Sequence, residues 1–123
     1  MSMNYQHTTT NLPEENEYPK LIRDLIPEVV KQADGVEVKT RVLDDAEYEQ
    51  FLRQKVVEEA TELQYADTDH NLAEEIADVR ELLDTIEKLK GISTEQMKSI
   101  QAEKRQKRGG FEKRLLMLEA AKR

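Results

Sequence analysis

Apolar residues recur at helical spacing in two long, consecutive stretches of the chain. The first stretch runs from Asp45 to Ala66 and the second from Asn71 to Lys90. The apolar positions are Tyr48, Phe51, Leu52, Val56, Leu63 and Ala66 in the first stretch, and Leu72, Ile76, Val79, Leu82, Leu83, Ile86 and Leu89 in the second. Such spacing is typical of amphipathic helices with one buried face. The short polar connection between the stretches predicts an antiparallel helical hairpin.

Two further helices are expected outside the hairpin. One runs from about Pro27 to Ala33, with Asp24 as its cap and Gly35 at its end. The other starts at Ser93-Thr-Glu-Gln96, which has the form of a capping box.

The segment from Val36 to Val42 alternates apolar and charged residues, and this alternation predicts a strand. A lone strand is unstable, so it needs a partner, either residues 111–118 or a neighbouring subunit. Within 111–118, the run from Leu115 to Leu118 is expected to be buried. The expected fold is mainly all-α: a helical hairpin or four-helix bundle completed by oligomerisation, with one short β element near residues 36–42.

The expected domain organisation is simple. Residues 1–18 lack periodicity and are predicted to form a flexible N-terminal arm, residues 19–118 a single domain, and residues 119–123 a C-terminal tail.

Composition narrows the classes of function. Charged residues make up 37% of the 123 residues and aromatic residues only 5%, which favours long helices with narrow apolar faces that a second subunit completes. The net charge of −7 argues against nonspecific binding to nucleic acid or to an anionic membrane. The chain has no cysteine, so thiolate chemistry and disulfides are excluded. No apolar run is long enough to span a bilayer, and a soluble cytoplasmic protein is expected.

Four acids occupy positions in or beside the apolar stripes of the hairpin. They form two pairs with i, i+3 spacing, Glu59 with Glu62 and Glu75 with Asp78. A carboxylate within an apolar face costs several kcal/mol unless it is paired or bound to a cation. Oxygen ligands without His or Cys favour Mg²⁺, with Mn²⁺ as a substitute. A hairpin brings both pairs to a similar level, so the sequence predicts a metal site there.

Basic residues are candidates for contacts with phosphate. Lys55 lies one turn before Glu59, and Lys104 and Arg108 continue the apolar stripe that Met97 and Ile100 open. Lys20 and Arg23 belong to a compact apolar and charged segment. Glu58 is a candidate general base, or an acid that contacts the metal ligands without binding the metal itself.

Three interpretations of this pattern remain open. The acids form a metal site for phosphate chemistry, or a buried cluster neutralised by Lys55, Lys104 and Arg108, or part of an acidic bundle without a site. For each basic residue named above, the alternative to a phosphate contact is a side chain that is simply exposed to solvent or paired with an acid. If a metal is bound, direct attack by water is the simplest mechanism, because the sequence offers no candidate for covalent catalysis.

The acidic residues also resemble a known family pattern. Glu58-Glu59-Ala-Thr-Glu62, followed by Glu74-Glu75-Ile-Ala-Asp78, resembles the EExxE and ExxD motifs of the all-α nucleoside triphosphate pyrophosphohydrolases, the MazG-like superfamily. KLIRDLIP from Lys20 to Pro27 and KRQKRGGFEKR from Lys104 to Arg114 are similar to its phosphoribosyl-ATP pyrophosphohydrolase-like branch. The resemblance covers about Tyr18 to Leu118.

The resemblance implies Mg²⁺-dependent cleavage of the bond between the α and β phosphates of a nucleoside triphosphate, with Glu59, Glu62, Glu75 and Asp78 as metal ligands. It also implies a homodimer or homotetramer. House-cleaning of noncanonical nucleotides is the preferred expectation. Its alternatives are phosphoribosyl-ATP hydrolysis in histidine biosynthesis and a non-catalytic helical oligomerisation or regulatory module. Candidates for stacking on a base are Tyr48, Phe51, Tyr65 and Phe111.

Overall fold

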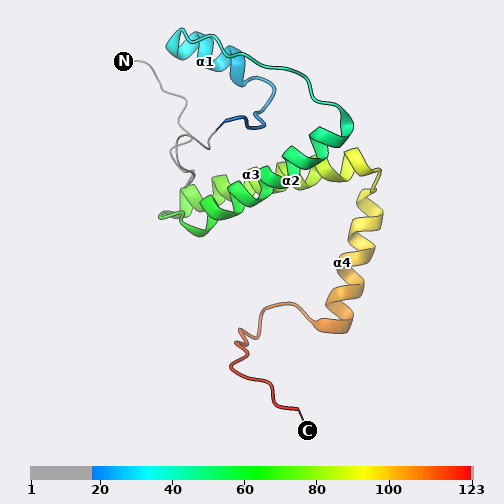
Figure 1. Cartoon of the computed structure of the whole chain (residues 1–123). Helices are drawn as coiled ribbons and strands as arrows, with labels where there is room; N and C mark the ends of the chain where they lie inside the picture. The colour runs from blue at the N-terminus through cyan, green and yellow to red at the C-terminus, as the bar shows by residue number, and fades with distance from the viewer. Residues whose placement is uncertain (1–17, 123) are drawn as a thin grey trace. The chain divides into compact units, whose positions relative to one another are not determined.

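The computed structural model describes residues 18–122, and all of the regular structure in that range is α-helical (Figure 1). The helices are α1 (Ile26–Asp34), α2 (Asp45–Gln64), α3 (Asp69–Lys90) and α4 (Thr94–Arg108). The chain divides between Lys90 and Gly91 into two compact units. The all-α expectation is confirmed for the described residues, whereas most of the predicted N-terminal arm lies outside them.

Helices α2 and α3 form the predicted hairpin and lie side by side along their length (Figure 1). The Asp44 carboxylate caps α2 by accepting a hydrogen bond from the backbone N–H of Glu47 at 2.9 Å. The connection ends at Thr68, whose hydroxyl oxygen accepts the backbone N–H of Asn71 at 3.0 Å. Side-chain oxygens thus accept backbone N–H groups at the start of both helices.

The apolar core of the hairpin is small. Leu52, 1% exposed, is the one fully buried apolar side chain in residues 18–122. The other apolar positions predicted for α2 are half-buried, but Leu72, Ile76 and Leu83 on α3 remain exposed. One copy of the hairpin therefore covers its apolar stripe only in part.

Helix α1 follows the expected limits but not the expected cap. Pro27 lies in its first turn, and Gly35 ends it with a left-handed φ of 67°. The N-cap residue is Leu25, and no side chain caps the helix, so the prediction for Asp24 is wrong. Asp24 lies one residue too early, and Pro27 lacks an N–H that a capping side chain would satisfy.

The strand predicted at residues 36–42 is wrong, because this segment is an irregular connection between α1 and α2. Val42 is 96% exposed, and the alternating residues have no neighbouring strand among the described residues. An extended segment without a partner cannot satisfy its backbone hydrogen bonds as a strand does.

The second unit consists of α4 and an extended segment. The capping box at Ser93 and Gln96 is present, as predicted, with hydrogen bonds of 3.1 and 2.8 Å. Phe111 and the run from Leu115 to Leu118 are highly exposed, so the predicted burial of Leu115 to Leu118 is wrong. Burial requires a surface to pack against, and this segment forms no second layer within its own unit.

None of the helices in the described part of the chain is both long and apolar enough to cross a membrane.

Candidate metal centre

The hairpin brings the four predicted ligands together through two overlapping groups of acids. Carboxylate oxygens of Glu59, Glu75 and Asp78 lie within 4.8 Å of one another, and so do those of Glu58, Glu59 and Glu62. Glu59 belongs to both groups. The i, i+3 spacing presents each pair on one helix face, and the antiparallel turn sets the two faces opposite each other.

Three of these acids are buried rather than solvated. Glu59 and Glu75 are each 8% exposed, and Glu62 is 5% exposed. The Oε2 atoms of Glu59 and Glu75 are both buried without a hydrogen-bond donor. A buried acceptor without a partner destabilises the fold, and either a proton or a cation would satisfy these oxygens. An all-oxygen set of carboxylates fits Mg²⁺ or Mn²⁺.

Burial also changes the pKa values of two of these acids. Burial raises the pKa of Glu59 to about 7, and the neighbouring Glu75 adds to this rise while Lys55 opposes it. Burial also raises the pKa of Glu75, with the charges of Glu62 and Asp78 adding to the effect. The raised pKa values favour protonation of Glu59 and Glu75, and a divalent metal would compete with those protons.

Lys55 lies beside two acids of the cluster. Its Nζ lies 3.3 Å from Oε1 of Glu58 and 3.7 Å from Oε1 of Glu59, and its side chain is largely buried. Together with Arg23, which pairs with Asp78, Lys55 supplies two positive charges beside the five acids.

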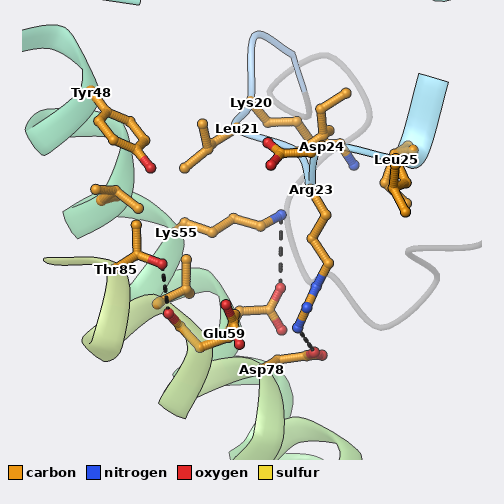
Figure 2. A pocket seen from close by; sticks show the side chains of 15 residues that line it. Lys20, Leu21, Arg23, Asp24, Leu25, Tyr48, Lys55, Glu59, Asp78 and Thr85 are labelled. Atoms are coloured by element: carbon orange, nitrogen blue, oxygen red, sulfur yellow. Dashed lines mark hydrogen bonds and ion pairs between the residues drawn. The ribbon is translucent and has the colours of Figure 1, made fainter. Parts of the chain in front are cut away.

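The segment from Lys20 to Ile26 forms one wall of a pocket beside the acids (Figure 2). The pocket has a volume of about 470 Å³. Arg23 reaches across it, and its Nη2 donates to Oδ1 of Asp78 at 2.7 Å. Lys20 and Lys55 line the same pocket. Guanidinium and ammonium groups next to a carboxylate cluster form a suitable environment for a phosphate that arrives with metal.

The other lining residues come from the wall segment and from the ends of α2 and α3 that lie away from the hairpin turn. They are Leu21, Ile22, Asp24, Leu25, Ile26, Tyr48, Leu52, Glu81, Leu82 and Thr85.

Part of this set was not anticipated from the sequence. Neither Thr85 nor Glu81 was singled out from the sequence, although both line the pocket. Helical periodicity could have identified Thr85, because it follows Asp78 by seven residues, about two turns, and therefore lies on the same helix face. Lys104 and Arg108 are exposed on α4 in the second unit, so their contribution to the acidic site stays a prediction.

Comparisons with protein-family models, with curated proteins and with solved structures found no match to this chain.

Proposed function

We propose that the protein is a Mg²⁺-dependent nucleoside triphosphate pyrophosphohydrolase, which releases a nucleoside monophosphate and pyrophosphate. The observation that carries this proposal is the pair of buried carboxylate oxygens without donors, on Glu59 and Glu75, beside a pocket with three cationic side chains. Buried acids at this spacing next to phosphate-binding groups combine the two requirements of metal-assisted phosphoryl chemistry. The resemblance to the MazG-like motifs supports the same reaction.

In this proposal Glu59, Glu62, Glu75 and Asp78 hold Mg²⁺. When bound, the metal would neutralise phosphate oxygens and lower the pKa of a coordinated water. The Glu58 carboxylate, at the edge of the cluster, accepts a proton from the attacking water, with Glu59 as a second candidate base. A new bond forms between the water oxygen and the α phosphorus, and the bond from that phosphorus to the α–β bridging oxygen breaks.

Basic side chains in the pocket hold the remaining phosphates. Lys20, Arg23 and Lys55 line the pocket, and their positive charges oppose the charge that accumulates on the leaving pyrophosphate. Lys104 and Arg108 are proposed to add further phosphate contacts.

The preferred substrates are noncanonical nucleoside triphosphates. The alternative substrate is phosphoribosyl-ATP, which carries the same α–β linkage. Both substrates require the same metal centre, so variants of the metal ligands cannot distinguish them. A panel of substrates can.

A nucleotide panel with Mg²⁺, scored for pyrophosphate and for orthophosphate separately, tests the reaction. We expect pyrophosphate release, and its loss in Glu59→Gln and in Asp78→Asn. Glu74→Gln is the matched control, because Glu74 lies next to Glu75 but is exposed, with its Oε1 2.8 Å from Nε2 of His70. The proposal fails if wild-type protein turns over no nucleotide, or if Glu74→Gln loses as much activity as the ligand variants.

The partly exposed apolar stripe of α3 favours one second candidate, a non-catalytic helical oligomerisation module. This alternative predicts that Mg²⁺ leaves the melting temperature unchanged. A metal site requires the opposite result, since a ligand that binds only the folded state raises the melting temperature.

A further inference from the structure

The pocket continues beyond the acidic cluster along the hairpin, and its far end has a different chemistry. Tyr48 precedes Glu59 by 11 residues on α2, about 16 Å along the helix axis. Thr85 follows Asp78 by seven residues on α3, about 10 Å in the same direction, because the helices are antiparallel. Figure 2 shows Tyr48 on one side of Lys55, and Glu59 and Asp78 on the other.

The two ends suit the two halves of a nucleotide. The acids and the cations Arg23 and Lys55 lie at one end. The Tyr48 ring and the apolar side chains of Leu21, Leu52 and Leu82 also line the pocket, together with the charged residues Lys20, Asp24 and Glu81. A pocket of this volume that combines apolar side chains with several charged groups is typical of a site for a small ligand.

We propose that Tyr48 is the platform on which the base of the substrate stacks, with Leu21 and Leu82 completing the base subsite. The chemical class of ligand is a planar heterocyclic base joined to a polyphosphate. The inference rests on the proposed function for its phosphate end.

Tyr48 is preferred over the other aromatic candidates by position. Tyr65 lies at the opposite end of α2 and is 67% exposed. Phe111 lies in the second unit and is 97% exposed. Phe51 is half-buried but does not line the pocket. Figure 2 shows the Tyr48 side chain projecting from α2 toward the segment that carries Leu21.

A purely structural role for Tyr48 makes a different prediction. In that case its ring only packs against the wall segment, and its loss weakens every ligand that the wall contacts. A base platform, in contrast, affects only ligands that have a base. Inorganic tripolyphosphate carries the phosphate charges without a base and therefore separates the two roles.

The test is calorimetric binding of two kinds of probe to the full chain in the presence of Mg²⁺. The probes are inorganic tripolyphosphate and the α,β-methylene analogues of ATP, GTP, CTP and UTP, which resist cleavage of the α–β linkage. We expect wild-type protein to bind at least one analogue more tightly than tripolyphosphate. Tyr48→Leu, which keeps apolar bulk but removes the ring, should weaken that analogue by about 5- to 150-fold, the range for one stacked base.

Three controls accompany this comparison. Tripolyphosphate affinity should not change in Tyr48→Leu, which also shows that the variant is folded. Tyr48→Phe keeps the ring and should retain the preference for the nucleotide analogue. Tyr65→Leu removes a tyrosine outside the pocket and should have no effect.

The inference is overturned if wild-type protein binds tripolyphosphate as tightly as every analogue. It is also overturned if Tyr48→Leu weakens both kinds of probe equally, or weakens neither. These outcomes are independent of turnover, so a failure to release pyrophosphate in the nucleotide panel would reject the proposed function separately.

Discussion

Glu59 is the residue that joins the two groups of acids, and its ionisation couples the fold to pH. Burial raises its pKa from 4.5 to about 7, so the folded protein binds a proton there that the unfolded chain has lost. Between these values the unfolded state binds fewer protons than the folded state, and stability falls as pH rises. Glu75 has a raised pKa and adds an effect of the same sign.

We therefore expect the metal-free protein to lose stability as pH rises from about 4.5 to about 7, with no further loss from Glu59 above that range. Glu59→Gln should flatten this dependence and should be more stable than wild type at pH 8 without metal. The measurement is chemical denaturation at a series of pH values in the presence of a chelator. A wild-type stability that rises over the same range would contradict the argument.

Arg23 is bound to Asp78, which is itself a proposed metal ligand. Removing the guanidinium frees the carboxylate for the metal but removes a phosphate contact. Arg23→Gln should therefore bind Mn²⁺ up to about fivefold more tightly, the limit for an exposed ion pair, and should bind nucleotide more weakly. Calorimetry with the metal alone and then with nucleotide measures both effects.

Arg53→Gln is the matched control for this experiment. Arg53 forms an exposed ion pair with Glu49 at 2.7 Å on α2, with its side chain outside the pocket lining. Its loss should change neither affinity. If Arg23→Gln weakens metal binding and nucleotide binding together, the ion pair organises the site instead of competing with the metal.

At the scale of elements, the α2–α3 hairpin depends on very few buried contacts. Leu52 is its one fully buried apolar side chain among the described residues, and it also lines the pocket. Leu52→Ala should cost about 2–5 kcal/mol of unfolding free energy, because it removes buried methyl groups and leaves a cavity.

The control is Val57→Ala, a smaller truncation at an exposed position of the same helix. Its free energy of unfolding should lie within about 0.5 kcal/mol of the wild-type value, apart from a small stabilisation because alanine favours helix more than valine does. Urea denaturation measures both variants. Equal costs for the two would show that packing at Leu52 does not hold the hairpin together.

For the whole molecule, the partly exposed stripe of α3 and the exposed apolar segment after α4 support the proposal of a homodimer or homotetramer. The units also differ in charge: residues 91–123 carry a net charge of +5, and the residues before them carry −12. Such a small core makes a stable isolated monomer unfavourable.

We expect light scattering to give a mass of two or four chains, and the melting temperature to rise with protein concentration. Leu83→Asp, in the exposed part of the α3 stripe, should reduce the mass. Val42→Asp, in the irregular connection before α2, is the control and should not. A monomeric mass at every concentration, or equal effects of the two variants, would argue against association through α3.

Features that depend on local sequence were predicted well. The two hairpin helices and the capping box at Ser93 follow from spacing over a few residues. The strand at 36–42 and the burial of Leu115 to Leu118 were wrong because both depend on a partner surface, which spacing within a segment does not specify.

By itself, the sequence determined that Glu59 and Glu62 share one helix face and that Glu75 and Asp78 share another, because helical periodicity places residues three apart side by side. Only the tertiary structure decided that the two faces meet, that Glu59 and Glu75 each hold a buried oxygen without a donor, and that Arg23 reaches Asp78 across 55 residues. Such contacts depend on how the chain folds back on itself. The spacing of residues within one helix does not encode which distant segment will lie against it.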